Sequence, residues 1–69
     1  MDKYINSTLS ETALIFRECD IVDSVIRNKS IIGDRSIIYK SNISDIVEIN
    51  RDCRIRYSNI GFGTTINKN

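Results

Sequence analysis

The sequence predicts an all-β chain that coils into a stack of short parallel strands, a β-helix with three strands in each 17-residue coil. Three observations predict this fold: evenly spaced aliphatic residues, a matching set of small residues, and the absence of charge from both sets. Isoleucine is frequent and proline is absent. The branched β-carbon of isoleucine packs well on a pleated surface, so this composition favours strands.

The aliphatic residues recur in steps of 6, 6 and 5, which together make a 17-residue repeat. Such self-similarity is typical of proteins that stack identical coils. About three and a half coils fit in the chain by this count. The predicted structural core is Leu9, Ile15, Ile21, Ile26, Ile32, Ile38, Ile43, Ile49, Ile55, Ile60 and Ile66.

A small residue stands two positions before each of these aliphatic residues. In a strand, residues two apart share a face, so both should point inward. No charged residue falls on either set. The small residues are Ser7, Ala13, Cys19, Ser24, Ser30, Ser36, Ser41, Val47, Cys53, Ser58 and Thr64.

A rival frame spaces the aliphatic residues six apart without a break, from Val25 to Ile55. That frame would turn Asp23, Lys29 and Arg35 inward. An unpaired buried charge costs too much free energy. We therefore prefer the frame that contains five-residue steps.

Successive coils should stack about 4.8 Å apart through parallel backbone hydrogen bonds. Equivalent residues then form columns, one of which contains only serines: Ser7, Ser24, Ser41 and Ser58. Small side chains are expected there because three strands converge on a thin prism. Gly33, Asn50 and Gly61 directly follow aliphatic positions, and we expect them to supply the positive φ that tight corners often need.

Length and charge limit the possible functions. A compact chain of 69 residues buries only about 60% of its unfolded surface, which favours oligomerisation or continuation in a longer protein. Ten basic residues balance nine acidic ones, so we expect no nucleic-acid partner. No apolar run reaches the roughly 18 residues of a membrane span. We expect no membrane association and a cytoplasmic location.

The segment Ser30-Ile31-Ile32-Gly33-Asp34 resembles the hexapeptide repeat of a large acyltransferase superfamily, and Ser58-Asn59-Ile60-Gly61 also fits. The order of shortened rungs between Asp23 and Arg51 is similar to the N-terminal coils of chloramphenicol/xenobiotic-type and sugar O-acetyltransferases. The resemblance covers roughly residues 7 to 68. It implies a left-handed β-helix, an exception to the usual right-handed crossover.

The resemblance also implies a trimer that binds acetyl-coenzyme A between adjacent subunits. In that family a histidine removes a proton from the acceptor hydroxyl of a sugar or antibiotic. This sequence has no histidine, so no catalytic residue can be assigned. We expect the N-terminal β-helix portion of an acetyl-CoA-dependent O-acetyltransferase, inactive and without bound cofactor as this chain alone. The alternative is a non-catalytic structural or interaction module that self-associates through its faces or ends.

In domain terms, we expect an N-terminal lead-in over residues 1–6 and a hexapeptide-repeat β-helix over residues 7–69 that is incomplete at its C-terminus. Cys19 and Cys53 lie two coils apart in one column, at about 9–10 Å. A disulfide needs Cα atoms within about 7 Å, so we predict two free, buried, inert thiols. No histidine or cysteine cluster joins them, and we expect no metal site.

Other polar residues have simpler interpretations. Gly61-Phe62-Gly63 lacks the following helix that an anion site would need, so it is interpreted as a corner. Arg51, Arg54 and Arg56 lie among acidic residues and predict a surface of mixed charge. The candidate general bases Asp23, Asp34, Asp45 and Asp52 are interpreted as solvated corner residues.

Two outward apolar residues predict a subunit contact. Leu14 and Ile31 occupy equivalent places in successive repeats, so they should stack on one outer face. A stacked pair of exposed apolar residues is typical of an interaction site. We expect a trimer contact at this pair.

Overall fold

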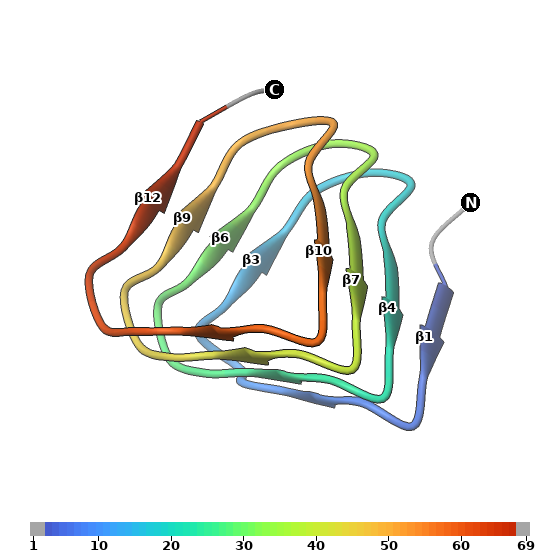
Figure 1. Cartoon of the computed structure of the whole chain (residues 1–69), viewed down its shortest axis with the longest axis horizontal. Helices are drawn as coiled ribbons and strands as arrows, with labels where there is room; N and C mark the ends of the chain where they lie inside the picture. Colours follow the sequence, from blue (N-terminus) through green and yellow to red (C-terminus); the bar gives the residue numbers. More distant parts are fainter. Residues whose placement is uncertain (1–2, 68–69) are drawn as a thin grey trace.

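The computed structural model describes residues 3–67 and is a three-sided parallel β-solenoid (Figure 1). It contains twelve short strands and, within the described range, no helix. Each of its three sheets has four parallel strands. The all-β fold, the three strands per coil and the 17-residue period predicted from the sequence are confirmed. The left-handed sense of the coil stays a prediction.

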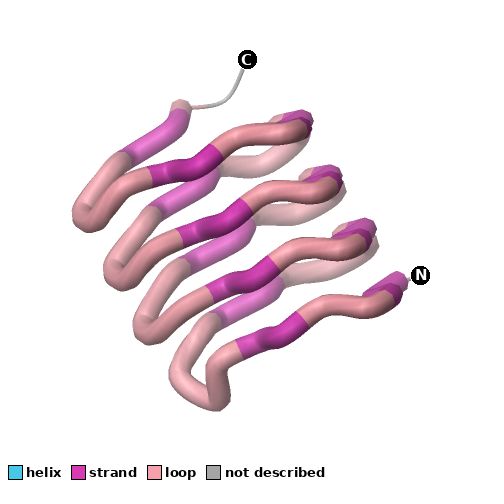
Figure 2. The backbone as a smooth tube through the Cα atoms, turned by 60° about the horizontal axis from the view of Figure 1, so that its bottom comes forward, coloured by secondary structure: helices cyan, strands magenta, loops and turns pink. Residues whose placement is uncertain are grey.

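The strands of each sheet come from successive coils, which lie one above another along the solenoid axis (Figure 2). The first sheet contains β1 (Lys3–Ile5), β4 (Asp20–Val22), β7 (Ile37–Tyr39) and β10 (Arg54–Arg56). The second sheet contains β2 (Thr8–Leu9), β5 (Val25–Ile26), β8 (Asn42–Ile43) and β11 (Asn59–Ile60). The third sheet contains β3 (Leu14–Ile15), β6 (Ile31–Ile32), β9 (Glu48–Ile49) and β12 (Thr65–Ile66).

The isoleucine columns are in the predicted register. Ile26 pairs with Ile43, and Ile32 pairs with Ile49, each pair being one repeat apart. The central members of every column are almost fully buried, whereas Leu9, Ile15, Ile60 and Ile66 are half-buried in the outermost coils. No charged residue in the described range is buried. Apolar burial inside the prism therefore holds the coils together.

The solenoid extends further toward the N-terminus than the aliphatic spacing indicated. Strand β1 lies within the segment interpreted as a lead-in, and it pairs with β4 in the first sheet. Tyr4 occupies the place of an isoleucine and pairs with Ile21, but remains 44% exposed. The sequence analysis did not predict this first strand, because it searched for aliphatic residues and the inward position here is a tyrosine.

The corners contain a regular set of residues in the left-handed region. Our expectation that Gly33, Asn50 and Gly61 supply positive φ was wrong, because the left-handed residue comes two positions later, at Arg35, Asp52 and Gly63. Left-handed backbone costs about 1–2 kcal/mol for a residue with a side chain. A hydrogen bond to the preceding coil offsets this cost, for example from the Arg35 N–H to the Arg17 carbonyl at 2.8 Å. The other left-handed residues are Asn6, Glu18, Asp23, Lys29, Lys40, Ile46 and Tyr57.

Gly33 is needed for a different reason, which is that the backbone of the next coil leaves no room for a side chain. A Cβ atom at Gly33 would lie 2.6 Å from the backbone N of Arg51 and 2.6 Å from the carbonyl carbon of Asn50. At Gly61, by contrast, a Cβ would meet nothing within 4 Å. The corner at Gly33 therefore allows the next coil to approach closely.

The column of Ser7, Ser24, Ser41 and Ser58 forms hydrogen bonds between the coils, in addition to fitting the narrow interior. The Ser24 hydroxyl donates to the Val22 carbonyl at 2.8 Å and accepts the N–H of Ser41 at 3.1 Å. Ser41 repeats both contacts one coil later, donating to Tyr39 and accepting from Ser58. Buried polar groups are stable only when hydrogen-bonded, so serine is better suited here than another small residue.

Candidate functional site

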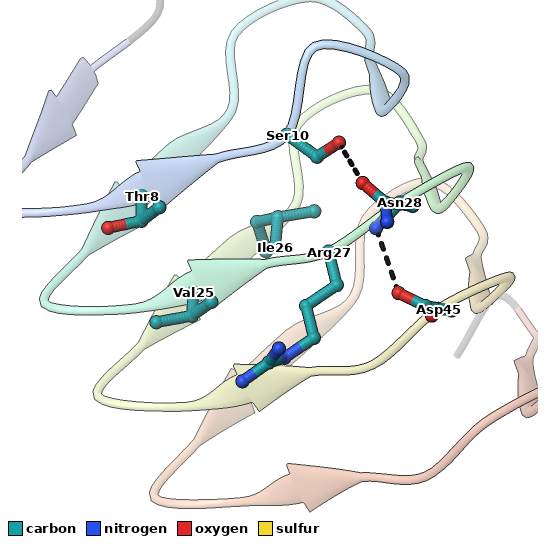
Figure 3. A pocket seen from close by; sticks show the side chains of 7 residues that line it. All are labelled: Thr8, Ser10, Val25, Ile26, Arg27, Asn28 and Asp45. Atoms are coloured by element: carbon teal, nitrogen blue, oxygen red, sulfur yellow. Dashed lines mark hydrogen bonds between the residues drawn. The ribbon is translucent and has the colours of Figure 1, made fainter.

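Two grooves lie open on the outer surface of the described residues. The larger groove, of about 390 Å³, follows the second sheet (Figure 3). Three of its polar residues bond to one another: the Ser10 hydroxyl donates to the Asn28 side-chain oxygen at 2.5 Å, and the Asn28 N–H donates to Asp45 at 3.1 Å. The lining residues are Thr8, Ser10, Val25, Ile26, Arg27, Asn28 and Asp45.

The groups in this groove that could bind a ligand are polar and charged. It contains a guanidinium, Arg27, and a carboxylate, Asp45. The Ser10 hydroxyl has Thr12 and Asn28 as neighbours rather than a base. A serine nucleophile needs an adjacent general base, and the carboxylate of this groove, Asp45, accepts the N–H of Asn28 instead.

The smaller groove, of about 270 Å³, follows the third sheet. Apolar and charged side chains share it, because Phe16 and Ile31 lie beside Asp34, Glu48 and Arg51. Three further residues complete the lining: Gly33, Ile49 and Asn50.

Leu14 forms an apolar surface together with Phe16 and Ile31, two of the residues that line this groove. Leu14 pairs with Ile31 in the strand register, as the sequence predicted. Leu14 is 57% exposed and Phe16 is 50% exposed. Farther along the same column the residues become Glu48 and Thr65, so the apolar surface occupies the N-terminal half of the face. Its use in a subunit contact stays a prediction.

The corner carboxylates accept hydrogen bonds from backbone N–H groups or from an arginine of a neighbouring coil. Asp34 accepts the N–H of Arg17 and Asp45 accepts that of Asn28, each at 3.1 Å. Asp52 binds Arg35 through two contacts, at 2.8 and 3.3 Å. These bonds stabilise the corners in which the three carboxylates lie. Asp23 lies at a corner as well, with left-handed backbone, and its N–H donates to the Ile5 carbonyl at 2.8 Å.

The arginine cluster is divided between two places. Arg54 and Arg56 lie on β10, on either side of the buried Ile55, whereas Arg51 lies in a corner and lines the smaller groove. All three are exposed. The mixed-charge surface expected around them stays a prediction.

An aromatic pair was missed by the sequence analysis. Tyr39 and Tyr57 pack edge to face with ring centroids 5.6 Å apart. The Lys40 ammonium lies 5.4 Å from the Tyr39 ring and 5.9 Å from the Tyr57 ring. The separation of the tyrosines along the chain exceeds the repeat by one position, so they occupy neighbouring columns, and a search for 17-residue spacing does not detect them.

Both cysteines are buried reduced thiols outside any disulfide, as predicted. The Cys19 thiol donates to the Gly33 carbonyl at 3.1 Å, and the Cys53 thiol donates to that of Asn67 at 3.4 Å. Burial raises the pKa of the Cys53 thiol, and the nearby Asp52 carboxylate raises it further. A thiol with a raised pKa is a poor nucleophile at neutral pH.

Residues 3–67 contain no group of three or more histidine, cysteine or acidic residues that could hold a metal ion. None of them forms a helix long and apolar enough to cross a membrane. The chain matches no protein-family model, no curated protein and no solved structure.

Proposed function

We propose that this chain is the β-solenoid portion of an acetyl-CoA-dependent O-acetyltransferase that modifies a hydroxyl group of a sugar or an antibiotic. The observation that supports the proposal is the unit Ser30–Asp34. Its Ser30 and Ile32 are buried, and Gly33 lies where the next coil passes closely. This is the residue pattern that resembles the acyltransferase repeat.

The proposal makes the chain a scaffold rather than a catalyst. The sequence has no histidine, and the corner carboxylates Asp34, Asp45 and Asp52 already bind backbone or guanidinium groups. Acetyl-CoA and the acceptor would therefore bind only in an assembly with further residues, including a general base. The proposed assembly is a cytoplasmic trimer that forms through Leu14 and Ile31.

An acyl-transfer assay tests the proposed inactivity. The purified chain is mixed with acetyl-CoA and either chloramphenicol or a sugar acceptor, and release of the coenzyme thiol is followed. We expect no release above that of a heat-denatured control. Chain-dependent thiol release would show that the chain itself is catalytic.

The coding region after Asn69 tests the family assignment. A continuation with further coils and a histidine supports the proposal, and adding it to the protein should produce thiol release. A stop codon directly after Asn69 would count against an acyltransferase portion.

A second candidate function is a non-catalytic module that self-associates through its faces or ends. The observation that favours it is that the outermost strands of all three sheets have one neighbour each among the described residues. Such edges can pair with another chain. Light scattering separates the candidates: one species of three times 7.9 kDa supports the trimer, and a series of sizes supports end association.

A further inference from the structure

The hydrogen bonds between coils repeat with a fixed direction at each position. The N–H of Thr8 donates to the Ser24 carbonyl of the next coil, and the N–H of Val25 donates to the Ser41 carbonyl in the same way. Asn42 and Ser58 continue the series with the same spacing along the chain. The left-handed corner residues donate in the opposite direction, to the preceding coil, as Lys40 does to Val22. The two ends of the solenoid are therefore chemically different and complementary.

The C-terminal end presents one half of this pattern. By the same spacing, the N–H groups of Asn59, Gly61 and Thr65 point past the last described coil, where residues 3–67 offer no carbonyl. Their equivalents one coil earlier all donate to this last coil: Asn42, Ser44 and Glu48, at 2.9, 3.1 and 2.9 Å.

The N-terminal end presents the matching acceptors. The carbonyls of Ser24, Ile26 and Ser30 accept N–H groups from the coil before them. Their equivalents in the first coil are the carbonyls of Ser7, Leu9 and Ala13, which have no preceding coil within residues 3–67. Figure 2 shows the two outer coils at opposite ends of the stack.

We infer that the C-terminal edge of one chain binds the N-terminal edge of a second copy, head to tail, in the register that continues the 17-residue repeat. The carbonyls of Ser7, Leu9 and Ala13 then accept the N–H groups of Asn59, Gly61 and Thr65 on the neighbouring copy. Two identical ends facing each other would make the strands antiparallel and break the register in which these groups match. The inference rests on the second candidate function, association through ends, and it is an alternative to the acyltransferase proposal, whose further coils would cover the C-terminal edge.

A corner supports this register with a bond in the opposite direction. The Val22 carbonyl accepts the N–H of the left-handed Lys40, and the Tyr39 carbonyl accepts that of the left-handed Tyr57. In the stacked pair, the next carbonyl of this series is that of Arg56, and the donor is Asn6 of the second copy. Asn6 already has the required left-handed backbone, with φ of 48°.

The serine column supports the register independently. The Ser58 hydroxyl donates to the Arg56 carbonyl at 2.7 Å, as Ser24 and Ser41 do to the carbonyls two residues before them. Those two serines also accept an N–H from the following coil. Ser58 is held in the same orientation, ready to accept the N–H of Ser7 from a second copy.

The apolar interior continues across the same junction. Ile60 and Ile66 are half-buried at one end, and Leu9 and Ile15 are half-buried at the other. Stacking places Leu9 on Ile60 and Ile15 on Ile66, which removes apolar surface from water.

Charge sets how this junction responds to salt. Arg54 would lie beside Lys3 of the next copy, and both side chains are exposed. Salt screens the repulsion between such like charges. Association of the ends should therefore strengthen as the ionic strength rises.

Mixed cysteine variants test the register. Thr8 of one copy should lie beside Asn59 of the next, at the strand spacing of about 4.8 Å, which permits a disulfide. An equimolar mixture of Thr8→Cys and Asn59→Cys chains is oxidised, and the cross-linked species are identified by mass spectrometry. We expect the mixed disulfide to be at least tenfold enriched over either homodimer. Homodimers in equal or greater amount would overturn the inference.

Asn42→Cys provides the matched control, because Asn42 lies in the same column between Val25 and Asn59. Mixed with Thr8→Cys, it should give no disulfide above that of the unmodified chain. A second control uses Asn59→Pro, which removes one edge N–H. Sedimentation should show loss of the larger species for Asn59→Pro and their retention for Asn59→Ala. Equal association of these two variants, or an unmodified chain that stays monomeric at every concentration, would also overturn the inference.

Discussion

The hydroxyl of Ser24 lies 3.1 Å from the backbone nitrogen of Ser41 and accepts its hydrogen bond. The two residues occupy the same place in consecutive coils, and both are buried. A Ser24→Ala variant keeps the small volume but leaves this buried N–H without an acceptor. We expect a loss of about 1–3 kcal/mol in the free energy of unfolding, measured by denaturant titration. Ser58→Ala, measured at a dilution where the chain is monomeric, is the control, because the Ser58 hydroxyl accepts no N–H within residues 3–67. Equal losses for both variants would contradict the explanation.

Gly33→Ala should destabilise the chain because the new methyl group would overlap the backbone of Asn50 and Arg51. Overpacking of this kind typically costs about 1–3 kcal/mol. Thermal unfolding followed by circular dichroism measures the effect. Gly61→Ala, with nothing within 4 Å of its Cβ, is the matched change and should leave the melting temperature nearly unaltered. A melting temperature for Gly33→Ala equal to that of the unmodified chain would disprove the close approach.

Ile38→Val should lower the free energy of unfolding by about 0.5–1.5 kcal/mol, because it removes one methylene from a side chain that is fully buried. Ile37→Val, at the neighbouring residue that is only partly buried, should have a smaller effect. Denaturant titration compares the two variants. If Ile37→Val were the more damaging change, the assignment of inward and outward positions would be incorrect.

Leu14→Lys should abolish a trimer that forms through the third sheet, because a charge on the contact would be buried without a partner. Light scattering gives the mass before and after the change. Thr65→Lys, in the same column three coils away, should leave the mass unaltered. A trimer that survives Leu14→Lys would place the contact elsewhere.

Neither cysteine of the folded chain should react with a thiol reagent at neutral pH, and both should react after denaturation. The raised pKa of Cys53 favours the neutral thiol in the folded state. Its contribution to stability is therefore complete below the unfolded pKa, about 8.5, and is lost as the pH rises through the higher folded value. The rate of reaction with the thiol reagent is measured as a function of pH, and the Cys53→Ser variant is the control for the contribution of Cys53. Rapid labelling of the folded chain at neutral pH would be the contrary result.

Side-chain direction could be predicted from the sequence almost completely. Ile32, Ser36 and Ile49 point inward as expected, because each position repeats a side-chain type along its column. Backbone features could not be predicted in the same way. Arg35 and Asp52 adopt left-handed φ because hydrogen bonds to the coil before them stabilise it. These are backbone hydrogen bonds, so they cannot be predicted from the type of side chain.

The candidate surfaces were only partly predictable. The pairing of Leu14 with Ile31 followed from the period. The Tyr39–Tyr57 contact did not, because it joins residues in neighbouring columns. Grooves form between side chains of several coils, so their shape depends on three-dimensional packing that spacing along the chain does not encode.

The equivalence of successive coils has a consequence for how this chain can be edited. Since Ser24 and Ser41 occupy the same place in consecutive coils, removing residues 24–40 would join Asp23 to Ser41 with every later side chain still in its column. Insertion of a second copy of the same segment would lengthen the solenoid by one coil and leave the register of the other coils unchanged. In stacked architectures stability is close to a sum of contributions from units and the contacts between neighbours. The free energy of unfolding should therefore change by the same amount for each coil that is removed or added.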